Sequence, residues 1–298
     1  MISRSGFASL VGRPNAGKST LTNALVGEKV AITSSRPQTT RRAIRGILTR
    51  PDAQLVLVDT PGLHRPRTLL GQRLNAVVRE TWAQVDVIAL CLPADAEVGP
   101  GDRFIARELA ALPGTPVLAV VTKTDLVDRD RVAAALVAAQ QLGERSGRAF
   151  ADIVPVSAVS RFQVDLLADL LVARLPEGPP LYPDNELTDS PTEARVAELI
   201  REAALEGVRD ELPHSLAVSI DEMTPERDVT VIHATVYVER DSQKPIVLGA
   251  GGSRLRDVGT AARREIEALL GGRVYLDLHV TVLKDWQRDP RQLRRLGF

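Results

Sequence analysis

The stretch Gly12-Arg13-Pro14-Asn15-Ala16-Gly17-Lys18-Ser19 decides the fold of the first half of this chain. It follows an apolar run at 7–11 and leads into a helical pattern from Thr20 onward. This strand–loop–helix setting is the one that the pattern G-x-x-x-x-G-K-[ST] needs in order to bind phosphate. The loop amides would surround phosphate oxygens, Lys18 would add a positive charge, and the Ser19 hydroxyl would bind magnesium. A tight glycine turn without a ligand does not explain all four fixed positions in this setting, so we predict a nucleoside triphosphate site over residues 12–20.

Length and composition set the class of protein. The 298 residues allow two domains, and 44% hydrophobic with 26% charged residues is typical of globular chains. Basic and acidic residues number 38 each, so net charge neither favours nor excludes nucleic acid. The single cysteine, Cys91, lies in an apolar run and fits a reducing compartment. With a strand expected almost at Met1 and no apolar stretch of about 18 residues, we expect a cytoplasmic protein.

Strand-like and helix-like runs alternate from residue 5 to about 175. Apolar runs predict strands at 7–11, 43–48, 55–58, 87–92, 117–121 and 153–156. Helical patterns lie near 102–111, 129–142 and 163–174. This alternation predicts an α/β fold, a mostly parallel sheet with helices on both faces, whose ligands bind at the carboxyl ends of the strands.

A second motif, Asp59-Thr60-Pro61-Gly62, follows one of these strand ends. The aspartate can hold magnesium through a water, and the Gly62 amide can reach a γ-phosphate. The motif alone could be a plain turn. Its position one strand after a phosphate loop indicates a nucleotide site.

Two later strand ends carry groups suited to guanine. Thr122-Lys123-Thr124-Asp125 ends one strand, and Asp125 can accept hydrogen bonds from the N1–H and the exocyclic amine of guanine. Adenine lacks both donors and would leave the carboxylate unpaired. Ser157-Ala158 would direct a backbone amide toward the guanine O6.

The order of these motifs is that of the translation-factor-like GTPases, and residues 1–175 resemble the GTPase domain of the Era family. Residues 32–35 and 37–41 resemble its first switch, and residues 59–64, through Leu63 and His64, resemble its second. The resemblance implies a P-loop GTPase that binds GTP or GDP with Mg²⁺. Thr40 is the residue expected on magnesium, with Thr39 as the competitor, and release of that contact after hydrolysis would make the loop a switch. His64 is expected to be a surface residue rather than a base.

The chain departs from common GTPase patterns at two positions. Thr122 replaces the asparagine of the usual N-K-x-D motif, and we expect weaker nucleotide binding with guanine choice kept by Asp125. Leu63 stands where Ras-like enzymes carry a water-orienting glutamine. Asn15 is the candidate to compensate, since related GTPases with this loop hold a potassium ion there, although the residue could instead only stabilise the loop. The expected catalytic residues are therefore Asn15, Lys18, Thr40 and Gly62, with slow turnover of roughly 10⁻⁴ to 10⁻² s⁻¹.

A proline-rich stretch at 176–183 marks a boundary, which gives a first domain over 1–175, a linker over 176–190 and a second domain over 191–298. Helical spacing at 196–204 precedes period-two runs at 216–220, 230–238 and 274–282. Between the last two lie Gly249-Ala250-Gly251-Gly252 and a helical pattern at 255–269. A G-x-x-G loop that opens a helix is how KH domains clamp a single strand, and this order of elements predicts a smaller α+β domain, a type II KH fold. By itself the loop could be a plain helix–turn–helix.

The residues expected to touch RNA are Lys244, Gly249, Ala250, Gly251, Gly252, Ser253, Arg254 and Arg256. Gly251 stands where members of the family often carry lysine, and Arg254 and Arg256 are the candidates to replace that charge. His279 is expected to be a solvated strand residue rather than a metal ligand. His233 and His214 show no partner pattern.

Residues 210–215, 243–246 and 293–298 also resemble Era, so the resemblance covers nearly the whole chain. It implies binding to the 3′ end of small-subunit (16S) rRNA and a role in maturation of the small ribosomal subunit. The implied partners are that rRNA and the pre-ribosomal small subunit, with no DNA, no obligate protein partner and at most a weak peripheral contact with the inner face of the membrane. Two alternatives stay open: a GTPase of RNA modification whose KH fold docks proteins, and a constitutive RNA-binding scaffold with a structural nucleotide.

Overall fold

The computed structural model describes residues 3–33, 40–41, 43–63, 68–206, 208 and 212–298, with only the backbone at 213 and 214. These residues form two compact units. The first unit contains the described residues up to 189 except 68–73, and the second contains 68–73 and 190–298.

A six-stranded sheet forms the centre of the first unit, in the order β2-β3-β1-β4-β5-β6. Five strands run parallel: β1 (Arg4–Val11), β3 (Ala53–Asp59), β4 (Val87–Pro93), β5 (Val117–Thr122) and β6 (Ile153–Pro155). The edge strand β2 (Ile44–Arg50) is antiparallel to β3. The predicted mostly parallel sheet is confirmed.

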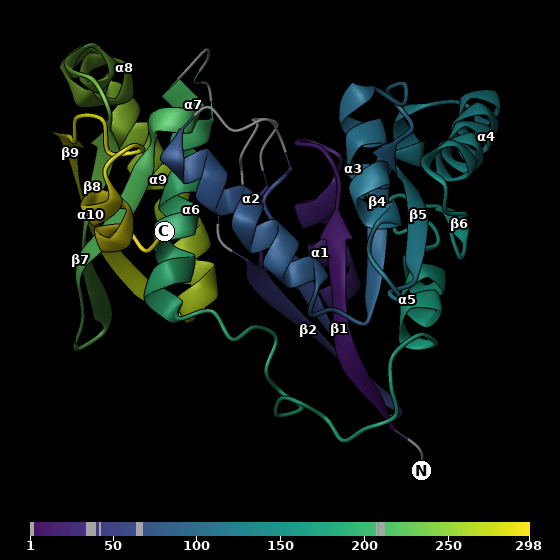
Figure 1. Cartoon of the computed structure of the whole chain (residues 1–298). Helices are drawn as coiled ribbons and strands as arrows, with labels where there is room; N and C mark the ends of the chain where they lie inside the picture. The colour runs from purple at the N-terminus through teal and green to yellow at the C-terminus, as the bar shows by residue number, and fades with distance from the viewer. Residues whose placement is uncertain (1–2, 34–39, 42, 64–67, 207, 209–211) are drawn as a thin grey trace. The chain divides into compact units, whose positions relative to one another are not determined.

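Helices cover both faces of this sheet (Figure 1). Helices α1 (Lys18–Val26) and α5 (Val164–Val172) share one apolar cluster with alternate residues of the strands. The other cluster contains residues of α3 (Pro100–Ala110), α4 (Arg129–Ser146) and the last turns of α2 (Leu69–Trp82). Strand β4 is buried along its whole length and contributes to both clusters, which explains its unbroken apolar sequence. A single turn, η1 (Thr124–Leu126), follows β5.

Residues 176–189, here called the strap, lie against strands of the first unit. Gln54 of β3 is buried and accepts hydrogen bonds from the amides of Leu181 (2.7 Å) and Tyr182 (2.8 Å) through Oε1. The amide of Ile47, on the edge strand β2, donates to the carbonyl of Leu187 at 2.9 Å. The proline-rich segment is therefore hydrogen-bonded to the sheet before the second unit begins.

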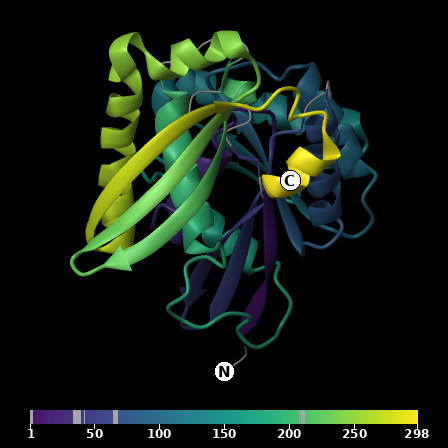
Figure 2. The same ribbon diagram turned by 90° about the vertical axis from the view of Figure 1, so that its left-hand side faces the viewer.

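The second unit is built around a three-stranded sheet in the order β7-β8-β9 (Figure 2). Strand β8 (Val229–Val238) pairs antiparallel with β7 (Ala217–Glu226) and parallel with β9 (Arg273–Val282). The other elements, in chain order, are α6 (Thr192–Leu205), α7 (Leu212–Ser215), η2 (Asp241–Gln243), α8 (Lys244–Leu248), η3 (Ala250–Gly252), α9 (Ser253–Leu270) and α10 (Pro290–Arg295). This is the predicted order of a type II KH domain, which is confirmed.

Candidate nucleotide site and nucleic-acid interface

The phosphate loop runs from the end of β1 to the start of α1. Gly12 adopts φ +156°, and a Cβ on it would lie 2.8 Å from the carbonyl oxygen of Cys91, so the close approach of β4 requires glycine. Lys18 lies in the first turn of α1, and its Nζ donates to the carbonyls of Gly12 (3.2 Å) and Arg13 (3.1 Å). The ammonium group thus links the two ends of the phosphate loop in this structure.

Three oxygen-bearing side chains from different elements meet beside this loop. Ser19 Oγ donates to Asp59 Oδ2 at 2.8 Å, and Thr40 Oγ1 donates to the same oxygen at 3.0 Å. The two hydroxyl oxygens lie 2.9 Å apart. Asp59 Oδ1 is buried and has no hydrogen-bond partner among the described residues. Hydroxyl and carboxylate oxygens that converge in this way, one of them unpaired, suit a small hard cation such as Mg²⁺.

The charges at this cluster are held in a buried environment. Burial raises the pKa of Asp59, and the nearby Lys18 charge and the hydrogen bonds from Ser19 and Thr40 act in the opposite direction. Burial lowers the pKa of Lys18, while Asp59 and Cys91 act to raise it. In both cases burial is the largest effect and opposes the charged form, and a cation beside Asp59 or an anion beside Lys18 would act in the opposite direction.

The residues expected to recognise the base contact each other and the phosphate loop. Thr122 Oγ1 donates to the carbonyl oxygen of Ala16 at 2.7 Å, which joins the end of β5 to the loop. Ser157 Oγ donates to Asp125 Oδ1 at 2.6 Å and fixes the carboxylate. The Ser157 amide donates to the Phe162 carbonyl at 3.1 Å, which leaves the Ala158 amide as the candidate for the guanine O6. An open depression of about 530 Å³ is lined by two residues of the expected site, Thr20 and Ala158. Its other lining residues are Asn23, Ala24, Gly27, Glu28, Lys29, Thr33 and Arg161.

In the second unit, the G-x-x-G loop joins α8 to α9. Gly249 adopts φ +72°, and a Cβ there would lie 2.7 Å from the Cβ of Arg254, so glycine is required. Gly252 also has a positive φ, and open space surrounds it and Gly251, so a phosphate can approach this backbone.

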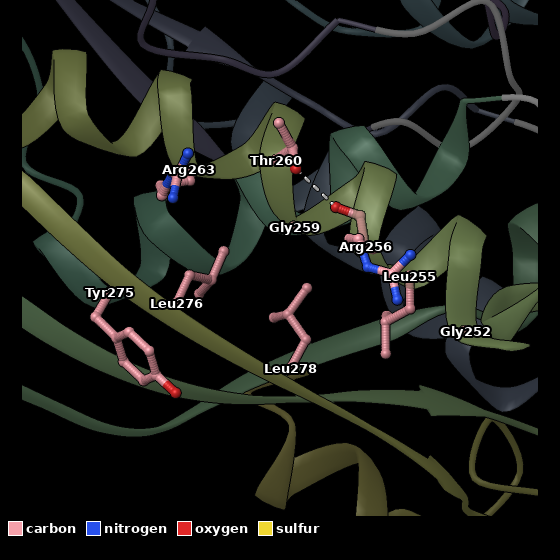
Figure 3. A pocket seen from close by; sticks show the side chains of 9 residues that line it. All are labelled: Gly252, Leu255, Arg256, Gly259, Thr260, Arg263, Tyr275, Leu276 and Leu278. Atoms are coloured by element: carbon pink, nitrogen blue, oxygen red, sulfur yellow. Dashed lines mark hydrogen bonds between the residues drawn. The ribbon is translucent and has the colours of Figure 1, made fainter.

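A groove of about 320 Å³ continues from this loop between α9 and β9 (Figure 3). Its floor is formed by Leu276 and Leu278, which are only half-buried, whereas Val274 and Val280 on the same face of β9 are 5% and 8% exposed. The gap exists because α9 presents Gly259 to Leu278 rather than a large side chain. The groove is lined by Gly252, Leu255, Arg256, Gly259, Thr260, Arg263, Tyr275, Leu276 and Leu278.

Comparison with known proteins gives a family for each of the two units. Residues 7–123 match the family model described as 50S ribosome-binding GTPase, and residues 211–287 match that of the KH domain. GTPase Era of Streptomyces coelicolor is 67% identical over 100% of this chain and 96% of its own length. GTPase Era of Mycobacterium avium is 66% identical over 99% of each chain.

The chain belongs to the Era family of GTPases. A solved structure of Era in complex with MgGDPNP and nucleotides 1506–1542 of 16S ribosomal RNA is 35% identical and covers 99% of each chain, with a TM-score of 0.94. A point variant of Aquifex aeolicus Era bound to GDP·AlF₄⁻ is 34% identical over 99% of each chain, with a TM-score of 0.93. The protein is therefore a GTP-hydrolysing P-loop enzyme with a C-terminal KH domain, as predicted.

The stretch that resembles the second switch begins with buried residues. Thr60 Oγ1 donates to the Leu10 carbonyl at 3.3 Å, and Pro61 is buried. A Cβ on Gly62 would lie 2.9 Å from the Pro14 nitrogen, so the Gly62 backbone rests directly on the phosphate loop. The Leu63 side chain packs in the core beneath the sheet, so any contact that this residue makes with nucleotide comes from its backbone.

Two other residues of the expected nucleotide site have contacts that the sequence did not indicate, and a third has an unusual backbone conformation. Arg13 Nε lies 3.5 Å from Oδ1 of Asp102, a buried residue in the first turn of α3. Lys123 Nζ pairs with Asp95 at 3.0 Å. Asn15 is exposed and adopts φ +62°, a left-handed conformation that asparagine tolerates better than most residues. Thr39 and His64 lie outside the described residues.

On the KH side, Arg254 is held by the end of α6. Its Nη2 donates to the carbonyls of Ala204 (3.0 Å) and Glu206 (2.8 Å), and burial lowers its pKa. Arg256 instead lines the groove and is exposed, while Lys244 and Ser253 are exposed at the starts of α8 and α9. The residues expected to touch RNA did not include Arg263, Tyr275 or the two floor leucines, because a groove depends on which helix residue faces which strand.

His233, which shows no metal-ligand pattern in the sequence, has a hydrogen-bonding partner on the next strand. His233 and Asp277 are register neighbours on β8 and β9, and His233 Nδ1 lies 3.3 Å from Asp277 Oδ2. His279 Nε2 lies at the same distance from that oxygen. No group of three or more potential ligand residues with metal-binding geometry occurs within the described ranges. The side chain of His214 is not described.

Proposed function

We propose that this GTPase is a switch whose KH domain binds the 3′ end of 16S rRNA and thereby assists maturation of the small ribosomal subunit. The groove that runs from the G-x-x-G loop along α9 carries the proposal. It combines an approachable glycine backbone, an apolar floor and the arginines Arg256 and Arg263 at its rim, which is the combination that single-stranded RNA requires. The 35% identical Era bound to a 16S rRNA segment supports the same ligand.

The nucleotide half of the proposal rests on the cluster around Asp59. Ser19, Thr40 and Asp59 would hold Mg²⁺, which when bound neutralises charge on the β- and γ-phosphates. Lys18 would exchange its two carbonyl acceptors for phosphate oxygens, and the Gly62 amide would meet the γ-phosphate. Thr40 belongs to the loop that leads into β2, so loss of its contact after hydrolysis would release that loop.

We also infer that Asn15 holds a potassium ion beside the phosphates. The Leu63 side chain packs in the apolar core, so it cannot orient the attacking water. Asn15 lies exposed at the tip of the loop and carries a carbonyl oxygen that suits a monovalent cation.

The partners and location follow from the RNA. A chain that acts on the pre-ribosomal small subunit would work in the cytoplasm. In the described part of the chain, no helix has the length and apolar content to cross a membrane. A weak peripheral contact through the basic residues at 284–295 stays a prediction.

The test is binding of a fluorescent RNA that carries the 16S 3′ end to the full chain, with a GTP analogue, GDP or no nucleotide, at fixed salt. Fixed salt matters because phosphate contacts make RNA affinity strongly salt-dependent. We expect sequence-dependent binding that is tighter with the GTP analogue. Gly249→Asp with Gly252→Asp should abolish it by placing two carboxylates where phosphates approach.

The matched control is Ala133→Asp with Ala134→Asp, which adds the same charge at exposed positions of α4. Binding that ignores the nucleotide would favour a scaffold with a structural nucleotide. Absence of RNA binding would overturn the proposal and favour a protein-docking KH fold.

A further inference from the structure

Tyr275 stands at the far end of the groove from Gly252. It lies on β9 and is 56% exposed, and Figure 3 places it at one end of the lining residues, with Gly252 at the other. Gly252 caps the start of α9, and Arg263 lies three helical turns later, about 16 Å along the axis. The groove therefore has a glycine end and an aromatic end.

The exposure of this ring is unusual for the second unit. Its other aromatic residues after 190 are Tyr237 and Trp286, which are buried, and Phe298, whose ring stacks on Trp286 with centroids 6.0 Å apart. β9 is an edge strand with β8 as its single strand neighbour, so the Tyr275 ring lies on an open border of the sheet. Tyr275 precedes Leu276 on β9, so its ring projects from the face of the strand opposite the floor leucines (Figure 3). An exposed ring beside the open edge of the sheet is available to a ligand that leaves the groove there.

The length of the groove indicates which nucleotide of a bound RNA would meet the Tyr275 ring. A KH domain clamps about four nucleotides from its G-x-x-G loop, and their bases would occupy the floor formed by Leu276 and Leu278. The next nucleotide then leaves the groove at the end where Tyr275 stands. Arg263 lines the same end from α9 and is exposed, so it can meet the phosphate of that nucleotide.

We propose that Tyr275 stacks on the unpaired nucleobase that follows those held in the groove and so lengthens the recognised RNA by one nucleotide. The inference rests on the proposed RNA-binding function. Every base has a face that can stack on an aromatic ring, so this contact adds affinity with little choice of base. Contacts in the groove would select the RNA sequence. Stacking on Tyr275 would add one nucleotide to the length of RNA that is bound.

The experiment measures how affinity depends on RNA length. A short RNA that fills the groove is compared with RNAs extended by one nucleotide at the 5′ or the 3′ end. For the unmodified chain we expect one of the two extensions to tighten binding about 5- to 100-fold, the range for base–aromatic stacking. A 2-aminopurine placed at the added position should lose fluorescence when bound.

Three variants separate stacking from folding. Tyr275→Ala should lose the gain from extension, measured within the variant as the ratio of its affinities for the extended and the short RNA. Tyr275→Thr removes the ring with good strand propensity, and Tyr275→Phe should keep the full gain. Phe104→Ala is the control, since Phe104 is an exposed aromatic of α3 in the first unit.

The outcomes distinguish the two proposals. Failure of the unmodified chain to bind any of the RNAs would overturn the RNA function itself. Binding of the short RNA without a gain from either extension, or with the same gain in Tyr275→Ala and Tyr275→Thr, would overturn the stacking role alone.

Discussion

Thr122 Oγ1 donates a 2.7 Å hydrogen bond to the carbonyl oxygen of Ala16, and both residues are buried. The bond links the motif expected to recognise the base to the phosphate loop. Gly17, the next loop residue, faces the same side chain, because a Cβ built on it would lie 3.6 Å from Thr122 Oγ1. The threonine that replaces asparagine therefore still makes one of the contacts that an amide would make.

Replacement of Thr122 by valine should weaken nucleotide binding. Valine keeps the shape but leaves the Ala16 carbonyl buried without a partner, which costs about 1–3 kcal/mol. We expect GDP affinity to fall roughly 5- to 100-fold in a fluorescent-nucleotide titration. Thr122→Ser keeps the hydroxyl and should bind normally, and Thr122→Asn should bind at least as tightly as the unmodified chain. Equal affinity of the valine and serine variants would show that the bond to Ala16 does not matter.

Asp125→Asn should change the choice of base. The Asp125 carboxylate is fixed by the 2.6 Å hydrogen bond from Ser157 Oγ. The side-chain NH₂ of an asparagine held in the same position would face the exocyclic amine of guanine, so two hydrogen-bond donors would meet. Xanthine carries an oxygen there, and we expect the variant to prefer xanthosine nucleotides in competition binding. Asp128→Asn, which keeps the cap of α4, is the control. If Asp125→Asn still preferred GTP, Asp125 would not be the residue that recognises the base.

Much of the first unit could be predicted because its signals are local. The phosphate loop, the strand ends and the G-x-x-G loop each place glycines and polar groups within a few residues. Helix α2 was not expected, although Leu70, Leu74, Val78 and Trp82 recur every four residues, so its pattern was present in the sequence.

Contacts between distant residues could not be read from the sequence. Gln54 is one polar residue in an apolar strand, and its partners in the strap lie 127 and 128 positions later. Arg254 was expected to face phosphate because it follows the glycine loop, yet its guanidinium binds the end of α6, 48 and 50 positions earlier. His233 meets Asp277 through the register of two parallel strands. Each of these contacts depends on tertiary packing.

Potassium should stimulate GTP hydrolysis through Asn15. We expect faster turnover in potassium than in sodium at equal ionic strength. Asn15 has a positive φ, which glycine adopts without strain. Asn15→Gly therefore keeps the loop conformation and removes only the side-chain amide. The variant should bind GDP normally and turn over at the same rate in both salts. Equal turnover of the unmodified chain in sodium and potassium would contradict the role.

The single thiol should be protected from alkylation until the first unit unfolds. Burial raises the pKa of Cys91 to about 12, and the thiolate is the reactive form. In native buffer, the rate with iodoacetamide should stay low at pH 8 and keep rising as pH increases beyond 9. In urea, the rate should level off once the pH passes the ordinary cysteine pKa of about 8.5. A native-state plateau near pH 9 would mean that the thiol is more accessible than its place in β4 indicates.

Replacement of Gln54 should loosen the strap and destabilise the first unit. The side chain uses its full hydrogen-bonding capacity: Oε1 accepts from two strap amides, and Nε2 donates to the Tyr182 carbonyl (2.9 Å) and to Thr49 Oγ1 (3.0 Å). Gln54→Leu has a similar volume but leaves these backbone groups unpaired, so we expect a loss of about 3 kcal/mol in urea unfolding and faster proteolysis within 176–189. Gln140→Leu, at an exposed position of α4, should change stability by less than about 0.5 kcal/mol. If the two variants unfolded at the same urea concentration, the strap would contribute nothing to the stability of the sheet.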